Sequence, residues 1–393
     1  MNRSSKIIKL LEWFALLVCL VIISRESPIL TSHKLLQVDD FVAYWTAGRL
    51  NATGNNPYDP AKIIPLQKEV GRFNGVPVFM WNPPWTLTFI MPFGILNYSL
   101  SRLLWLILHV VLVFFSADMS WRLYGGPPRY IWIAWIVAFT FSPTLFVLSV
   151  GQSSSMIFAG VIGFLIFIQR RQYWLSGTTL VLITVKPQLL YAFLIVLFLW
   201  TIEQRHWSIL LSCGMSLLVA TGIPLINNPA LLGQYLDLIV NYAPVYWQVP
   251  TLGGAIRFLL KIKNFWVQCI PTALGIIWAV LYWIRRRSTW VWLEEIPLLL
   301  LVSLVTSVYA WTYDQVVLVV VVVQVVIALL NKGEWQTAIM VLIPYFIINV
   351  LALVLRGSFH DFWFMWLSPA MLLWYLTIRW KSGIKLHLSK EAL

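Results

Sequence analysis

Charged residues are scarce in this chain of 393 residues, since Asp, Glu, Lys and Arg together make up only 11% of it. Soluble domains carry about 25% charged residues, so a soluble core enclosed by a charged surface is excluded. Hydrophobic residues account for 60% of the chain, and the mean hydropathy is +0.79. This composition indicates an integral membrane protein.

Cysteine and histidine are also few, which bears on the kinds of site to expect. Cys19, Cys213 and Cys269 all lie in apolar stretches without CxxC spacing, which supports neither a disulfide framework nor a zinc site. The five His residues include no HExxH pair, which argues against an intramembrane metalloprotease. Neither a metal ion nor an organic cofactor is expected.

The net charge of +13 does not indicate nucleic-acid binding. Lys and Arg occur in short clusters between apolar runs, where they act as signals of membrane topology. Basic residues also precede an apolar run over residues 7–23, a pattern shared by signal peptides and first membrane anchors. Because no small-residue cleavage site follows this run, a retained anchor is favoured.

The apolar runs are long enough to cross a bilayer as helices, because a hydrocarbon layer about 30 Å thick needs about 20 residues. An all-α fold is expected, since lipid offers no hydrogen-bond partners to an open backbone. We expect one membrane domain over residues 1–393 with twelve transmembrane helices, at residues 7–24, 102–121, 130–149, 152–169, 175–186, 187–202, 208–226, 265–284, 291–308, 313–330, 336–355 and 362–379.

A further apolar stretch, residues 84–97, is interpreted as a re-entrant or surface-lying element. If it does not cross the membrane, the Lys and Arg clusters from Arg122 to the C-terminal tail all fall on the side of the N-terminus. The positive-inside rule then places both termini in the cytoplasm of a multi-pass plasma-membrane protein.

This topology leaves two long segments on the outer face, residues 25–83 and residues 227–263. Each is expected to form amphipathic helices lying on the membrane, at residues 41–50 and 229–241. No soluble catalytic domain is appended, so any chemistry is expected at the outer surface of the membrane.

Four polar motifs fall on that same outer side, although they are far apart in the sequence. They are Asp39-Asp40, Gly151-Gln152 followed by the polar run Ser153 to Ser155, Lys186-Pro187-Gln188, and Tyr309 to Asp314. Their convergence predicts one polar site.

Lys186 is informative because a cation among apolar helices is unfavourable unless it faces a partner or water. One interpretation is a long side chain that reaches the membrane surface. The other is a ligand of an anionic phosphate at a helix broken by Pro187.

The other motifs also allow a structural and a functional interpretation. Asp40 suits the N-cap of a helix over residues 41–50, or Asp39 is the cap and leaves Asp40 free. Gln152 is either a turn residue or a ligand, and Tyr313 with Asp314 either caps the next helix or lines a site.

The order of these motifs resembles that of glycosyltransferase family 87. The resemblance extends over most of the chain and comprises D-F-x-x-Y with A-G (Asp40, Phe41, Tyr44, Ala47, Gly48), N-P-Y-D (Asn56 to Asp59), P-P (Pro83-Pro84), G-Q (Gly151-Gln152), K-P-Q (Lys186 to Gln188) and W-x-Y-D (Trp311 to Asp314).

This resemblance implies a GT-C fold and a donor sugar, mannose by family analogy, carried on polyprenyl phosphate. It further implies an acidic catalytic base in the first outer loop, a role that falls to Asp40 with Asp39 as the alternative. Because no D-x-D occurs near that loop, a metal-independent reaction is favoured.

The expected reaction is an inverting transfer in which Asp40 takes a proton from an acceptor hydroxyl on a glycan or glycolipid. Lys186, helped by Arg257 or Arg49, is expected to stabilise the departing phosphate. Gln152, Gln188, Tyr44, Tyr313 and Asp314 complete the predicted substrate-binding set. The alternative is a transporter or lipid flippase, which twelve crossings and a broken helix also suit.

Overall fold

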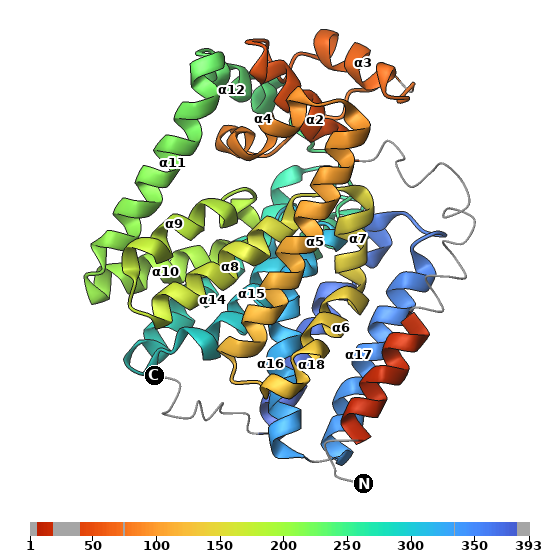
Figure 1. Cartoon of the computed structure of the whole chain (residues 1–393), viewed down its shortest axis with the longest axis vertical. Coiled ribbons are helices and arrows are strands. Elements are labelled where there is room, and N and C mark those ends of the chain that lie inside the picture. The colour runs from red at the N-terminus through yellow and green to blue at the C-terminus, as the bar shows by residue number, and fades with distance from the viewer. Residues whose placement is uncertain (1–5, 19–39, 74, 334, 383–393) are drawn as a thin grey trace.

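The computed structural model describes residues 6–18, 40–73, 75–333 and 335–382, and every regular element in these ranges is a helix (Figure 1). The expected all-α fold is confirmed. A helix over residues 6–18 is followed by α2 (Phe41–Ala52), α3 (Pro60–Glu69), η2 (Pro84–Thr86), α4 (Leu87–Ile95), α5 (Tyr98–Leu123), η3 (Pro128–Tyr130), α6 (Trp132–Thr140), α7 (Ser142–Val150), α8 (Ser154–Gln169) and α9 (Tyr173–Ile183).

The remaining elements form the second half of the fold. They are η4 (Pro187–Leu190), α10 (Tyr191–Gln204), α11 (Trp207–Asn227), α12 (Leu231–Tyr242), α13 (Leu252–Leu259), η5 (Phe265–Cys269), α14 (Ile270–Arg286), η6 (Arg287–Thr289), α15 (Trp292–Thr306), η7 (Thr312–Leu318), α16 (Val319–Lys332), α17 (Trp335–Leu355), η8 (Asp361–Phe364) and α18 (Leu367–Ser382).

The expected twelve crossings are not confirmed. In the described residues, six helical segments are long and apolar enough to cross a membrane, or seven if the bent pair Pro128–Thr140 and Ser142–Val150 is one span. The six are Tyr98–Leu123, Pro187–Gln204, Trp207–Asn227, Phe265–Thr289, Thr312–Lys332 and Gln336–Leu355.

The other predicted spans fall on shorter elements. The span at 152–169 became α8, of 16 residues, and the span at 175–186 became α9, of 11 residues. At about 1.5 Å per residue these helices are about 24 and about 16 Å long, short of the hydrocarbon thickness. The span at 291–308 is a helix of 15 residues, the one at 362–379 begins in a 3-10 turn, and part of the one at 7–24 lies outside the described residues.

The expected surface helices differ from each other in the structure. Residues 41–50 do form a helix, α2, but nearly all of its side chains are buried, so it is not amphipathic. By contrast, α12 covers the second predicted element and exposes Leu232, Leu236, Ile239 and Val240, as a helix on a membrane surface would. The apolar stretch 84–97 contains η2 and the nine-residue α4, and it is not a candidate span.

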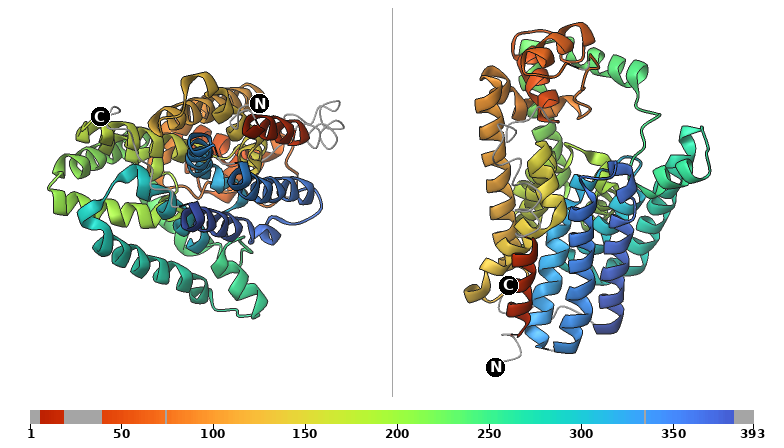
Figure 2. Two further views of the ribbon diagram at one scale, coloured as in Figure 1. Left: turned by 90° about the horizontal axis from the view of Figure 1, so that it is seen from below. Right: turned by 90° about the vertical axis from the view of Figure 1, so that its right-hand side faces the viewer.

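Two hydrophobic clusters divide the molecule along its length. The smaller one joins α2, α4 and α12 with Trp105 of α5, and these elements lie at one end of the molecule (Figures 1 and 2). The larger one fills the bundle below, into which α5 continues. With 26 residues, α5 is about 39 Å long and therefore connects the two clusters.

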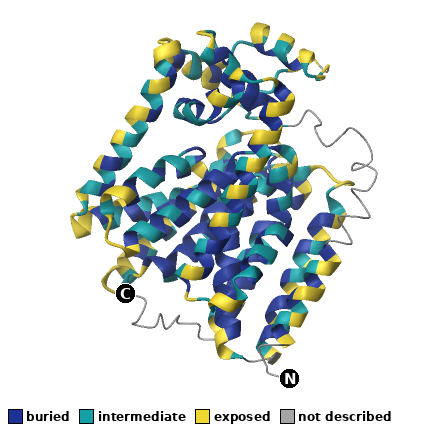
Figure 3. Ribbon diagram, in the orientation of Figure 1, coloured by how far each residue is buried: buried dark blue, intermediate teal, exposed yellow. Residues whose placement is uncertain are grey.

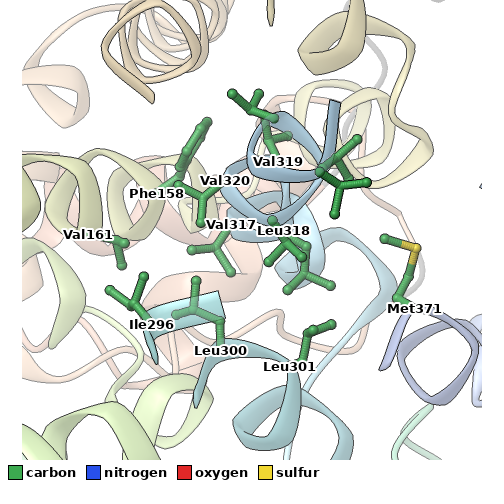
Figure 4. Packing of buried hydrophobic residues seen from close by; sticks show 14 of the residues in the cluster. Phe158, Val161, Ile296, Leu300, Leu301, Val317, Leu318, Val319, Val320 and Met371 are labelled. Carbon is green, nitrogen blue, oxygen red and sulfur yellow. The ribbon is translucent and has the colours of Figure 1, made fainter. Parts of the chain in front are cut away.

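The core of the bundle is formed by η7 and α16. Residues 316–323 have at most 1% of their surface exposed, and this segment lies at the centre of the ribbon (Figure 3). Val317 and Val320 pack among side chains of α8, α15 and α18, including Phe158, Leu300 and Met371 (Figure 4). A helix that is apolar on all sides is buried among other helices. The packing of this segment therefore also fixes the position of Asp314, which lies at the start of η7.

A buried ionic cluster lies at the first turn of α15, far from the loop that follows this helix. Glu295 is fully buried and pairs with Arg286 at 2.8 Å and with Arg379 at 3.3 Å, and Tyr282 donates a hydrogen bond to it. Arg286 belongs to the basic run assigned to topology in the sequence. In the structure Arg286 neutralises the buried carboxylate of Glu295. A buried carboxylate without a positive partner would be strongly destabilising in that position.

Candidate active site

Asp40 begins α2, but its side chain does not cap that helix. Instead, its Oδ2 accepts a hydrogen bond of 3.0 Å from Nε2 of Gln152. In the described chain no group donates to the second oxygen of Asp40, Oδ1, and the residue is only half-buried. The capping interpretation is therefore not supported, and the carboxylate remains free to act on a ligand.

Gly151 sets the position of Gln152 at the end of α7. It has a φ of 71°, in the left-handed region that favours glycine, and a Cβ there would lie 2.8 Å from Cβ of Phe41. Trp105 donates to the Gly151 carbonyl at 2.8 Å, and Arg102 donates to the carbonyls of residues 148 and 149 at 3.1 Å each. The G-Q motif is thus a turn held tightly against α2 and α5.

The side chain of Gln152 links three other polar groups. Its Oε1 accepts from Tyr44 Oη at 2.6 Å and from Lys186 Nζ at 3.0 Å, while its Nε2 donates to Asp40. Because both partners of Oε1 are donors, the orientation of the amide is defined by its neighbours. Tyr44 also lies 3.2 Å from Oγ of Ser153.

The backbone around Lys186 is shaped by Pro187. Proline has no N–H and disfavours helix in the residue before it, so the backbone of Lys186 leaves the helical region, with φ −141° and ψ 75°. Two carbonyls near this break accept hydrogen bonds from the side chains that flank the P-P motif: Asn82 donates to Val185 at 3.0 Å and Trp85 to Thr184 at 3.2 Å. The break directs Lys186 toward α8 and η7.

The ammonium group of Lys186 has three hydrogens and three acceptors. Nζ lies 2.7 Å from Asp314 Oδ1, 3.0 Å from Gln152 Oε1 and 3.2 Å from Ser154 Oγ. It also lies 4.9 Å from the centre of the Tyr313 ring. The side chain is 10% exposed and that of Asp314 only 2%, so this is a buried ion pair and Lys186 does not extend to the membrane surface.

Asp314 both caps η7 and holds the lysine. Its Oδ2 accepts from the backbone N–H of Trp311 at 2.8 Å, and its Oδ1 accepts from Ser154 at 2.5 Å as well as from Lys186. A second carboxylate, Asp361, holds the neighbouring residue Thr312 through its hydroxyl at 2.6 Å and its N–H at 3.3 Å. The W-x-Y-D turn is therefore fixed by two acids from different segments.

Burial affects the protonation of two groups at this site. It raises the pKa of Tyr44 above its usual value, more than the charge of Lys186 lowers it, so the phenol stays protonated and can donate to Gln152. Burial likewise raises the pKa of Asp361, although the hydrogen bonds from Thr312 oppose this effect.

The structure brings together six of the predicted site residues, namely Asp40, Tyr44, Gln152, Lys186, Tyr313 and Asp314. It does not bring in the other predicted residues that it describes. Arg49 contacts Trp45 and the Gly94 carbonyl, Arg257 pairs with Gln268, and the exposed Gln188 contributes only its carbonyl, to Ser307. Asp39 lies outside the described residues.

Sequence reasoning missed two members of the network. Asp361 precedes a predicted span and carries no motif, so only its proximity to Thr312 reveals it. Ser154 was recognised only as part of a polar run. Among the described residues, no group of three or more His, Cys, Asp or Glu side chains is placed to hold a metal ion.

Comparison with known protein families gives one finding. Residues 79–263 match the family model of glycosyltransferase family 87. This segment includes Gln152, Lys186 and the P-P motif, whereas Asp40 and Asp314 lie outside it on either side. Comparisons with the curated proteins and with the solved structures gave no match.

Proposed function

This chain carries a glycosyltransferase family 87 domain over residues 79–263, and we propose from that premise that it transfers a hexose from a polyprenyl-phosphate sugar to an acceptor hydroxyl with inversion. The observation that carries the proposal is the contact between Asp40 and Lys186 through one side chain, Gln152. An inverting transfer needs a base at the acceptor and a positive group at the departing phosphate. These two groups come from distant parts of the sequence and lie on either side of the same amide.

Asp40 is proposed as the general base. Its Oδ2 is held by Gln152, which leaves Oδ1 available for the proton of an acceptor hydroxyl. As that hydroxyl attacks the anomeric carbon, the C–O bond to the phosphate breaks and the proton passes to Asp40. General-base catalysis of this kind contributes about 10²–10⁴-fold.

Lys186 is proposed to stabilise the phosphate as it departs. All three of its hydrogens already have acceptors, so a phosphate oxygen would reach Nζ by replacing Gln152 or Ser154. Asp314 would remain bound and hold the ammonium in place. Arg49 and Arg257 are engaged elsewhere in this conformation, and the proposal gives them no direct contact with the phosphate.

A lipid-borne donor suits the placement of the site. The network lies where the ends of α7 and α9 and the start of η7 meet α2, and several candidate spans adjoin it. Nucleotide sugars are not expected outside a cell, so a site on the outer face would take its sugar from a carrier in the membrane. The proposed localisation is the plasma membrane, with both termini cytoplasmic.

A transfer assay separates the enzyme from a transporter or flippase. Purified full-length protein in sealed proteoliposomes is given polyprenyl-phosphate [¹⁴C]mannose and, in parallel, the glucose donor, together with a cell-envelope lipid extract as acceptor. The proposal predicts a labelled glycoside with the anomeric configuration opposite to that of the donor. Movement of labelled donor between leaflets without a new glycosidic bond would support the transporter instead.

A further inference from the structure

A row of aromatic side chains leads away from the polar network. The aromatic wall is defined here as Trp81, Trp247, Tyr309, Trp311 and Tyr313. These residues come from three separate segments: the stretch before η2, the loop between α12 and α13, and the segment that runs from the loop after α15 into the start of η7. All five side chains keep part of their surface exposed.

The rings of the wall contact one another in sequence. The ring centroids of Trp81 and Trp247 are 5.7 Å apart, those of Trp247 and Trp311 are 5.7 Å apart, and Trp311 stacks with Tyr313 at 6.4 Å. Tyr309 adjoins Trp247 at 6.5 Å. Since Tyr313 also lies against the ammonium of Lys186, the wall ends at the proposed site of reaction.

The polar atoms of the wall are accessible, whereas indole N–H groups of the packed interior are bonded to a carbonyl or, as in Trp135, Trp290 and Trp292, buried without a partner in the described chain. Five other Trp residues donate their indole N–H to a backbone carbonyl, namely Trp45, Trp85, Trp105, Trp121 and Trp374. Within the described residues, the indole N–H groups of Trp81, Trp247 and Trp311 make no such bond. Trp247 is 40% exposed. The wall therefore offers ring faces together with unused donors.

This combination suits a saccharide better than an isoprenoid chain. The C–H face of a sugar ring packs on an aromatic ring, and its hydroxyl oxygens accept hydrogen bonds from donors at the ring edge. An isoprenoid has no acceptors, and covering an indole N–H with it would leave that donor unpaired at about 1–3 kcal/mol. The wall also reaches Lys186 through Tyr313, and Lys186 is linked to Asp40 by Gln152, so the wall is not confined to the surface facing lipid.

We propose that the aromatic wall is the acceptor subsite and that the acceptor is itself a saccharide, whose sugar rings stack on Trp247 and Trp311 while one hydroxyl reaches Asp40. This inference rests on the proposed function and specifies its acceptor class. It assigns the loop between α12 and α13 a role in choosing the acceptor.

Binding is tested without turnover. Saturation-transfer NMR is recorded on the full chain in nanodiscs with a panel of methyl disaccharides (mannobiose, glucobiose and galactobiose), using D40N protein so that no product forms. We expect transfer from aromatic protons to sugar C–H protons for at least one member, at least fivefold weaker in W247A. The control W174A removes a similarly exposed Trp, 46% exposed on α9, and should retain the signal.

Kinetic measurements then distinguish a saccharide at the aromatic wall from the isoprenoid tail of the donor. In otherwise wild-type protein, W247A should raise KM for a saccharide acceptor about tenfold and change KM for the donor less than twofold. A rise in the donor KM that grows with the length of its isoprenoid tail would overturn the saccharide proposal, as would the absence of saccharide binding in D40N or unchanged binding in W247A. Saccharide binding to the wall without any transfer by wild-type protein would instead contradict the proposed function.

Discussion

Nε2 of Gln152 donates a hydrogen bond to Oδ2 of Asp40 at 3.0 Å, although 112 positions separate the two residues in the sequence. The opposite end of the same amide accepts from Tyr44 and Lys186. One uncharged side chain therefore connects the proposed base with the proposed phosphate ligand and keeps their charges from pairing directly.

Replacing Gln152 should impair catalysis more than folding. Q152A removes the bond to Asp40, and a hydrogen bond to a charged group contributes about 1.5–3 kcal/mol, so kcat should fall about 10- to 100-fold. Q152E should be at least as damaging, because it places a second carboxylate against Asp40. Initial rates of transfer at saturating donor measure both effects.

The matched control is Q172A, an exposed glutamine at the start of α9. It should retain the wild-type rate within twofold. A wild-type rate for Q152A would show that Asp40 needs no partner at this position.

Breaking the ion pair of Lys186 with Asp314 should separate stability from activity. K186M leaves a carboxylate that is 2% exposed without its partner, and loss of one member of a buried pair is destabilising by about 3–5 kcal/mol. The double variant K186M/D314L removes both charges and should recover most of the thermal stability. Neither variant should transfer sugar if Lys186 contacts the phosphate.

The measurements are the midpoint of thermal unfolding and the transfer rate of the folded fraction. Activity in the double variant close to that of the wild type would assign the pair a structural role alone.

Asp361 should give stability a dependence on pH that D361N removes. Burial raises the pKa of Asp361 above its ordinary 3.8, so the folded protein holds this proton more tightly than the unfolded chain. Its contribution to stability is complete below about pH 4 and is lost as the pH rises through the raised folded value. D361N does not titrate, so its unfolding midpoint relative to wild type should improve between pH 4 and pH 7.

An Asn at position 361 still offers an oxygen to the hydroxyl of Thr312. The two proteins therefore differ at this position mainly in the charge of the side chain. Unfolding midpoints recorded at intervals across that range test the prediction. A difference between the two proteins that stays constant with pH would contradict it.

Glu295 provides a structural counterpart to the active-site pair. E295Q removes the charge that neutralises Arg286 and Arg379, and it should lower the unfolding midpoint clearly. The cluster lies at the first turn of α15, far from the loop that leads to Asp314. The transfer rate per folded molecule should therefore stay within twofold of the wild type, and a specific loss of activity would show that the two ends of α15 are coupled.

The sequence predicted the members of the site better than the path of the chain. Lys186 stands out because a cation is unfavourable among apolar helices, and Asp40, Gln152 and Asp314 stand out because their motifs fall on the same expected outer side. The number of membrane crossings could not be predicted from the sequence, because hydropathy alone does not distinguish a membrane span from a short buried helix such as α8 or α9.

Other features depended on contacts that no local pattern records. The burial of α2 follows from its packing against α4 and α5, which a helical pattern in one segment cannot reveal. The role of Asp361 follows from one contact across 49 positions, with Thr312. The aromatic wall is likewise formed by three loops whose Trp residues are indistinguishable in sequence from the many others.

The most direct test of the account compares D40N with the wild type in single-turnover transfer from a labelled polyprenyl-phosphate sugar. D59N is the matched control, because Asp59 caps α3 through a hydrogen bond from Ala61 and lies outside the network. If Asp40 is the base, D40N should transfer at least about 10²-fold more slowly while folding and binding donor normally, and D59N should keep the wild-type rate. Transfer by D40N at the wild-type rate would contradict the account.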